Sequence, residues 1–296
     1  MALKYVKKSQ DLITSHEAIR NGFLQQAITK GIHSKRHLLR AVEFQNALQK
    51  VKKIENLLGQ IPDFKNELVA SAGFSEKAFN HLSGPELEGI IEKALTTTLT
   101  EADFRQELVH RYLLTKGDTL GGSMRNIIGS SAGEKLVDLI LQQLTKKKIK
   151  YEIVKSKAGK ITGIKWPNRY LLFDQKPKIV GKNIDAILID LTGSTTFTSE
   201  VFNDPKRYLA CGELKGGIDP AGADEHWKTA NSALDRIRTT FASQKKNPKL
   251  FFVGAAIEVS MASEIFAQIE EGKLSYVANL NYEDQIKDLV VWLTTL

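Results

Sequence analysis

The residues with the clearest chemical potential are a glutamate and a lysine two positions apart, Glu213 and Lys215, and an aspartate upstream, Asp185. Period-2 alternation along a strand points Glu213 and Lys215 to the same face. Two carboxylates on neighbouring strands offer the hard oxygen ligands that Mg²⁺ prefers. A lysine beside them offsets charge on a phosphate or orients a water molecule. These residue types predict metal-dependent hydrolysis of a phosphodiester.

The Glu-x-Lys pattern is weak by itself. A second copy, Glu271 and Lys273, occurs near the C-terminus, where an exposed helix end is expected. A chance ion pair at a strand end is the alternative explanation of the first copy. Asp190 competes with Asp185 for the upstream position and ranks second.

The elements that would position these residues follow from hydrophobic periodicity. Short antiparallel strands are expected over residues 151–155, 160–166 and 170–173. Apolar runs at 184–191, from 208 onward and at 250–257 predict buried strands, with a helix over 223–244 between the last two. An apolar stripe over 133–144 predicts an amphipathic helix that carries Glu134, and the tail, 262–296, mixes a helix with polar connections. The pattern predicts an α/β fold with a mixed central sheet flanked by helices.

The first 115 residues show helical periodicity, including one run at 34–58, and are expected to form an all-helical region before a core at 116–296. A basic cluster within it, between Lys30 and Arg40, is either a solvated helix face or a surface that meets DNA. Thr115–Gly129 is rich in glycine between a helix end and a new helix. It is either a hinge or a loop that approaches phosphates, with Ser123 and Arg125 as candidate contacts. Its glycine spacing matches no P-loop or dinucleotide motif.

Composition narrows the class of partner. The 296 residues include 42 Lys plus Arg against 34 Asp plus Glu, a formal net charge of +8 and a pI near 9.3, which favour polyanions. The single cysteine, Cys211, excludes an internal disulfide framework and a multi-cysteine zinc site. A signal peptide and an apolar run of membrane-spanning length are both absent from the sequence, so a cytosolic protein without a membrane partner is expected.

The order of these elements resembles the PD-(D/E)XK nuclease core over residues 117–258. The segment GELKGGIDPAGADEHWKTA, Gly212–Ala230, is similar to type II restriction endonucleases, especially the AvaI/BsoBI group. The resemblance implies that Asp185, Glu213 and Lys215 are the metal and catalytic positions. Ile184 stands where a proline is usual, and the N-terminal helical region does not align by motif, which leaves base specificity open.

The same resemblance assigns further roles. Glu134 would support the metal site, Asp219 would contact a base, and His226 would assist catalysis. The alternatives are an Asx turn for Asp219 before Pro220 and a cap or surface position for His226. Two further candidate DNA contacts, Lys228 and Arg236, lie on the helix that follows the motif.

The implied activity is site-specific double-strand cleavage of DNA, leaving 5′-phosphate and 3′-hydroxyl ends. Mg²⁺ is the expected cofactor, Mn²⁺ could replace it, and Ca²⁺ would support binding without cleavage. A short palindromic site, such as a degenerate CYCGRG hexamer, requires a homodimer with dyad symmetry in the prokaryotic cytosol. A cognate methyltransferase would act on the same site without being a bound partner. The alternatives are a repair or junction-resolving PD-(D/E)XK nuclease and a catalytically inactive DNA-binding protein.

Overall fold

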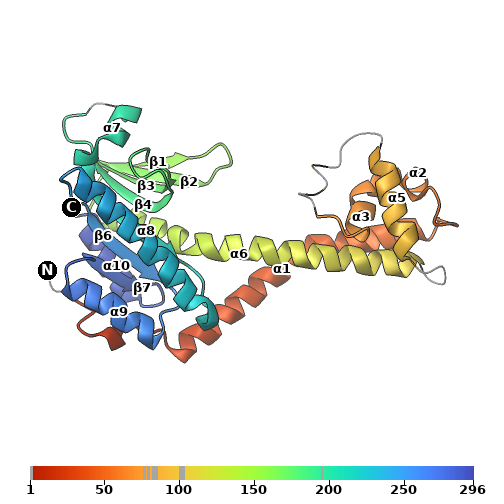
Figure 1. Ribbon diagram of the computed structural model, residues 1–296, viewed down its shortest axis with the longest axis horizontal. Helices are drawn as coiled ribbons and strands as arrows, with labels where there is room; N and C mark the ends of the chain where they lie inside the picture. Colours follow the sequence, from red (N-terminus) through yellow and green to blue (C-terminus); the bar gives the residue numbers. More distant parts are fainter. Residues whose placement is uncertain (1–2, 76–77, 79–80, 82–85, 100–103, 195) are drawn as a thin grey trace. The chain divides into compact units, whose positions relative to one another are not determined.

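The computed structural model describes residues 3–75, 78, 81, 86–99, 104–194 and 196–296 (Figure 1). The chain divides into two compact units. One comprises residues 1–23 and 127–296, here called the sheet unit, and the other comprises residues 24–126, here called the helical unit. The boundary expected near residue 115 therefore falls inside the helical unit, and the first 23 residues belong to the sheet unit.

The described residues of the sheet unit form a seven-stranded sheet in the order β1-β2-β3-β4-β5-β6-β7. Strands β1 to β5 pair antiparallel, whereas β5, β6 and β7 run parallel. The expected mixed sheet is thus confirmed. Its strands are β1 (Glu152–Lys155), β2 (Ile161–Trp166), β3 (Arg169–Gln175), β4 (Ile184–Asp190), β5 (Tyr208–Lys215), β6 (Lys249–Gly254) and β7 (Tyr276–Asn279).

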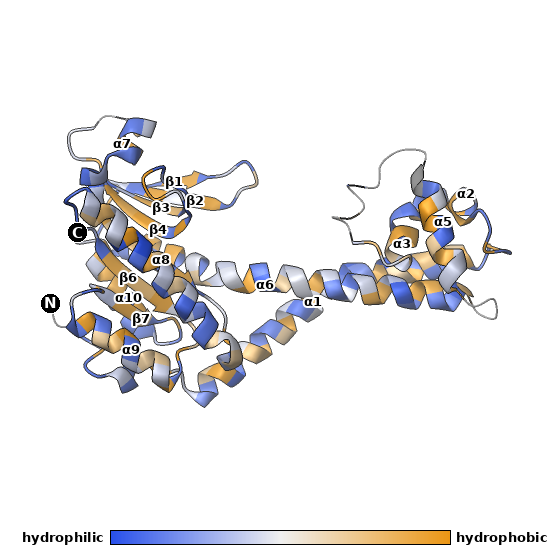
Figure 2. Cartoon of the chain, viewed as in Figure 1, coloured by the Kyte–Doolittle hydropathy of each residue, from blue (hydrophilic) through white to orange (hydrophobic). Residues whose placement is uncertain are grey.

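Helices cover this sheet because each buries one apolar stripe. In α8 (Ala223–Ser243), Trp227, Leu234 and Phe241 are fully buried or nearly so and recur at helical spacing. Figure 2 shows the contrast between the hydrophobic central strands and the mixed surface of the helices. The other helical elements after β3 are α7 (Ser199–Asn203), α9 (Val259–Glu270), α10 (Glu283–Leu293) and two short 3₁₀ turns, η3 (Pro205–Arg207) and η4 (Pro220–Gly222).

The helical unit has a core of its own, centred on Phe44, Leu68, Leu108 and Tyr112. Arg40 donates to the buried Glu67 at 2.9 Å. This member of the basic cluster is therefore held by a carboxylate. The helices are α1 (His16–Leu48), α2 (Leu57–Gln60), α3 (Lys65–Ser71), α5 (Glu86–Thr98) and α6 (Phe104–Lys146), with the 3₁₀ turn η2 (Pro62–Phe64). Both α1 and α6 contribute residues to both units.

Three expectations about helices and strands were wrong. The glycine-rich segment 115–129 is neither hinge nor loop but part of α6, since buried Leu120 and Met124 outweigh the low helix propensity of its glycines. The run at 34–58 is split, because α1 ends at Leu48. The tail contains β7 and α10 in addition to the expected helix.

The N-terminal segment is tied to the sheet unit by a buried polar network. Thr14 Oγ1 donates to the carbonyl of Ala255 at 2.9 Å and accepts from the N–H of Ile257 at 2.9 Å. The side-chain amide of the fully buried Asn279 donates to Thr14 Oγ1 at 2.7 Å and to the carbonyl of Leu12 at 2.8 Å. Residues before α1 therefore fill hydrogen-bonding positions inside the core.

We predict that Asn279→Ala destabilises the sheet unit by about 2–3 kcal/mol, because it leaves the carbonyl of Leu12 buried without this donor. Urea titration followed by tryptophan fluorescence measures this, since all three tryptophans (Trp166, Trp227 and Trp292) lie in the sheet unit. The exposed Asn247→Ala is the control, with an expected change within about 0.5 kcal/mol. Equal changes in both variants would contradict a stabilising role of the network.

Candidate active site

The antiparallel pairing of β4 and β5 brings the predicted chemical residues together. Ala186 pairs with Gly212, so the next positions in opposite directions, Asp185 and Glu213, are neighbours. The backbone N–H of Leu214 donates to Asp185 Oδ2 at 2.8 Å, which fixes the Asp185 carboxylate at the end of β5. Both strands are apolar and buried over most of their length, so the carboxylates lie at the edge of a rigid core.

Lys215 completes the cluster. Its Nζ lies 3.0 Å from Glu213 Oε2 and 3.2 Å from Asp185 Oδ2. The contact with Glu213 confirms that period-2 alternation places these two side chains on one face. The structure thus brings Asp185, Glu213 and Lys215 together in one cluster. A chance ion pair between Glu213 and Lys215 would not need the second carboxylate.

Burial sets the electrostatics of the cluster. Glu213 is 4% exposed. Its burial, followed by the nearby charge of Asp185, raises its pKa to about 7 despite the neighbouring ammonium group. Burial opposes the charge of Lys215, yet the carboxylates of Asp185 and Glu213 outweigh it and raise the pKa of Lys215. Lys215 therefore stays a cation while Glu213 exchanges its proton near neutral pH.

A cavity of about 270 Å³ opens beside Asp185, and Glu134 and Asp138 of α6 line it. Glu134 accepts a hydrogen bond from Ser130 Oγ at 3.0 Å. Among the residues that the structure describes, no three His, Cys, Asp or Glu side chains are grouped closely enough to hold a metal ion. Asp185 and Glu213 nevertheless provide two converging carboxylates, the number that Mg²⁺ commonly takes from a protein when phosphates and water supply the rest.

This cavity also contains an ion pair that was not identified from the sequence. Lys160 and Asp174 both line it, and Lys160 Nζ contacts Asp174 Oδ2 at 2.5 Å. Asp174 has a φ of 53° and is left out of the register between the Phe173 and Gln175 pairs, at the level of Asp185. Only the strand register reveals this placement, because a lysine and an aspartate in polar strand ends carry no local signal.

The turn after Lys215 is closely packed against two helices. A Cβ at Gly216 would lie 2.3 Å from the carbonyl oxygen of Ile128 in α6. A Cβ at Gly217 would lie 2.6 Å from Cε1 of His226 in α8. At Gly216 the clash is with backbone, so a glycine is required there, and at Gly217 any side chain would have to displace the His226 ring. His226 therefore lies directly against the turn that follows β5.

The remaining candidate residues are placed individually. Asp219 is exposed and accepts from the N–H of Ala221 at 3.0 Å, so it forms the Asx turn before Pro220. Lys228 is exposed on α8 and pairs with Asp224 at 2.5 Å, and Arg236 is exposed on the same helix. On α6, in the helical unit, Ser123 Oγ donates to the carbonyl of Thr119 at 3.0 Å and Arg125 is exposed.

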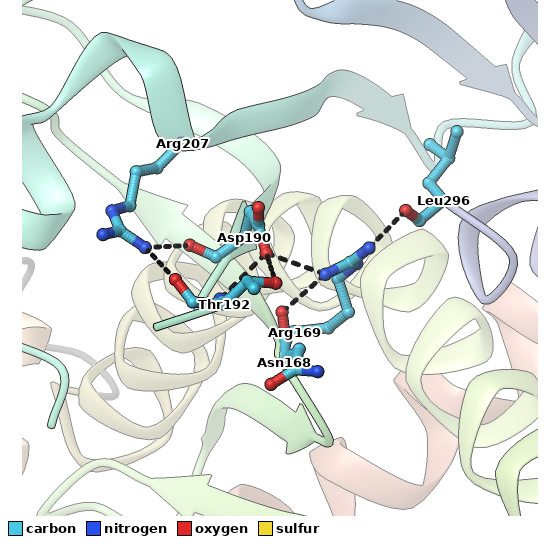
Figure 3. A network of polar contacts seen from close by, with 6 residues as sticks. All are labelled: Asn168, Arg169, Asp190, Thr192, Arg207 and Leu296. Carbon is cyan, nitrogen blue, oxygen red and sulfur yellow. Dashed lines mark hydrogen bonds and ion pairs between the residues drawn. The ribbon is translucent and has the colours of Figure 1, made fainter. Parts of the chain in front are cut away.

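Asp190, the rival of Asp185, lies at the opposite end of β4 in a structural network (Figure 3). Its Oδ1 accepts from Arg169 at 2.8 Å and from Thr192 Oγ1 at 2.6 Å. Burial opposes its charge, but the hydrogen bonds from Thr192 and the charges of Arg169 and Arg207 lower its pKa. These contacts fix the β4 terminus and leave Asp185 as the carboxylate beside Glu213.

The second Glu-x-Lys copy lies at the exposed C-terminal end of α9, as predicted, and there it forms an ion pair. Lys273 Nζ and Glu271 Oε2 lie 2.7 Å apart, and both side chains are about half exposed, 51% and 52%.

Within the part of the chain that the structure describes, no helix combines the length and hydrophobicity needed to cross a bilayer.

Comparisons with known proteins extend the resemblance beyond the motif. Residues 3–296 match the family model described as restriction endonuclease BsobI. The chain is 37% identical over 312 residues to the type II restriction enzyme AvaI of Nostoc sp. (strain PCC 7120 / SAG 25.82 / UTEX 2576), covering 99% of this chain and 98% of that protein. It is 37% identical over 315 residues to the type II restriction enzyme BsoBI of Geobacillus stearothermophilus, covering 99% and 97%. The N-terminal helical region, which the motif alone did not align, is therefore part of the similarity.

The raised pKa of Glu213 predicts a specific pH dependence of stability. The folded protein holds a proton on Glu213 that the unfolded chain releases above its ordinary pKa of 4.5, so this contribution is full below 4.5 and is lost as the pH rises through about 7. In EDTA, Glu213→Gln should therefore gain about 2 kcal/mol relative to the unmodified protein between about pH 5 and about pH 8. Thermal unfolding measures this, with the exposed Glu271→Gln as control. A Glu213→Gln difference that stays constant with pH would refute the assignment.

Proposed function

Because the chain belongs to the restriction endonuclease BsobI family, we propose that it cleaves both strands of duplex DNA at a short palindromic site in a Mg²⁺-dependent reaction. The observation that carries this proposal is the cluster in which Lys215 Nζ lies within 3.2 Å of the carboxylates of both Asp185 and Glu213. Such a cluster is suited to a phosphodiester with a divalent cation.

Asp185 and Glu213 are the proposed metal ligands, and Glu134 would support the site from the cavity wall that it shares with Asp185. Bound there, Mg²⁺ would polarise the phosphodiester and lower the pKa of the attacking water. Mn²⁺ would substitute for it, whereas Ca²⁺ would support binding without cleavage. Glu213 must lose its proton to serve as a ligand, which favours activity above neutral pH.

The chain's own residues supply the rest of the proposed reaction. Lys215 holds a positive charge next to the position of the scissile phosphate and offsets the charge that grows on it. His226, packed against Gly217 beside the catalytic strand, would assist proton transfer or hold a phosphate. In-line attack by water expels the 3′ oxygen, so the products carry 5′-phosphate and 3′-hydroxyl ends.

DNA recognition is proposed to use both units. Asp219 is exposed, and its carboxylate could accept from cytosine N4 in the major groove. Lys228, Arg236, Arg125 and Ser123 are the proposed backbone contacts, and the helical unit would embrace the duplex. The net charge of +8 supports binding to a polyanion. Cutting both strands of a palindrome needs two active sites related by a dyad, so we propose a cytosolic homodimer.

We predict that the purified protein converts phage DNA into discrete fragments in Mg²⁺ and gives none in EDTA. Sequencing of the fragment ends would give the site and the overhang. A smear would instead indicate a nonspecific nuclease. Tight binding in Ca²⁺ with no cleavage in Mg²⁺ would indicate a DNA-binding protein.

Lys215→Ala should lower the cleavage rate by at least about 100-fold, because it removes the charge that stabilises the phosphate in the transition state. Lys273→Ala is the matched control, since it removes the lysine of the exposed Glu-x-Lys copy, and its rate should stay within about twofold. Time courses on a plasmid with one site measure both. Equal rates for the two variants would exclude Lys215 from catalysis.

A further inference from the structure

The turn that follows Lys215 has a third helical contact besides those of Gly216 and Gly217. Ile218, which is 4% exposed, lies against Gly22 of α1. A Cβ at Gly22 would stand 2.4 Å from Ile218 Cγ1 and 3.0 Å from both Cβ and Cγ2 of Ile218. The isoleucine therefore fills the slot that the glycine leaves in the helix surface, and any side chain at position 22 would displace it.

Ile218 has little freedom to move aside. Its branched Cβ restricts the first side-chain torsion, and it belongs to the buried core of the sheet unit. Its neighbour on one side is Gly217, packed against His226, and on the other is Asp219. A shift of Ile218 would therefore shift the backbone that carries Asp219 and leads back to Lys215.

The segment before α1 supports the other side of the same turn. The N–H of Ala255 donates to the carbonyl of Lys215 at 2.8 Å. Thr14 in turn donates to the carbonyl of Ala255 at 2.9 Å. Residues 14–22 thus reach the catalytic turn twice, through the hydrogen bonds of Ala255 and through the slot at Gly22.

We propose that Thr14–Gly22 is a positioning element for the active site, in which the Gly22 slot sets the place of Ile218 and thereby of Lys215 and Asp219. This inference rests on the proposed nuclease function. In this role Gly22 and Ile218 are positioning residues, which act through the turn. The helix accepts a glycine, with its low helix propensity, because the slot needs one.

The same helix contains a matched control. Gly31 has no atom within 4 Å of a Cβ built on it, so Gly31→Ala changes the helix without filling a contact. Gly22→Ala makes the identical chemical change where the slot is occupied by Ile218. Ile218→Ala empties the slot instead, and the double variant Gly22→Ala with Ile218→Ala restores the space.

The experiment compares single-turnover cleavage in Mg²⁺ and DNA affinity in Ca²⁺ for these four variants and the unmodified protein. Gly22→Ala should lower the cleavage rate constant at least about tenfold, because misplacing a catalytic group by about 1 Å can cost about 100-fold in rate. Its Kd should rise by a smaller factor than the rate constant falls, since Asp219 is one proposed DNA contact among several. Ile218→Ala should also be slower, the double variant should be faster than Gly22→Ala, and Gly31→Ala should stay within about twofold.

Amide hydrogen exchange of residues 216–222 gives a readout that does not depend on cleavage. Exchange should be at least about tenfold faster in Gly22→Ala and Ile218→Ala than in Gly31→Ala. Unchanged cleavage and exchange in either single variant would overturn the inference, as would a double variant whose effects are the product of the two single ones. An unmodified protein that fails to cleave, with the expected exchange pattern, would overturn the proposed function and leave the positioning role supported. If Gly22→Ala does not fold, Ile218→Ala alone decides.

Discussion

The buried carboxylate of Glu213 is the constraint on which the rest of the site depends. A carboxylate with 4% exposure is costly unless a cation lies beside it, and here Lys215 Nζ is 3.0 Å away on the same strand. Across the β4–β5 pair, a second carboxylate, that of Asp185, lies next to the same ammonium group. One ammonium group shared by two carboxylates leaves one unit of negative charge, which favours either a proton on Glu213 or a divalent cation.

This charge arrangement requires an accurate backbone. Lys215 is the last residue of β5, so its position depends on the turn that follows as well as on the sheet. Three consecutive turn residues, Gly216, Gly217 and Ile218, each pack against a different helix, α6, α8 and α1 respectively. The helices thus do more than cover the sheet, because they also pack against the turn that joins the end of β5 to Asp219.

Sequence reasoning succeeded where the signal was local. The apolar runs over β4, β5 and β6 predicted buried strands, and period-2 alternation predicted the Glu213–Lys215 pair. It failed where tertiary burial outweighed propensity, as in the glycine-rich part of α6, where Leu120 and Met124 are buried. It also could not pair Gly22 with Ile218, nor place Asp174 at the level of Asp185, because such contacts depend on long-range register and carry no local pattern.

The choice between Asp185 and Asp190 shows how the fold resolves an ambiguity that the sequence pattern leaves open. Both aspartates lie on β4, but a shift in register between Leu188 and Ile189 and the arginines around Asp190 commit that end of the strand to structure. At the other end Asp185 receives the N–H of Leu214 and the ammonium group of Lys215, and its surroundings open into a cavity. On the proposed function, a divalent cation would compete with Lys215 for the same carboxylate oxygens. The displaced ammonium group would then be free to face the phosphate. The same lysine would thus stabilise the buried carboxylates when no metal is bound and the substrate once metal binds.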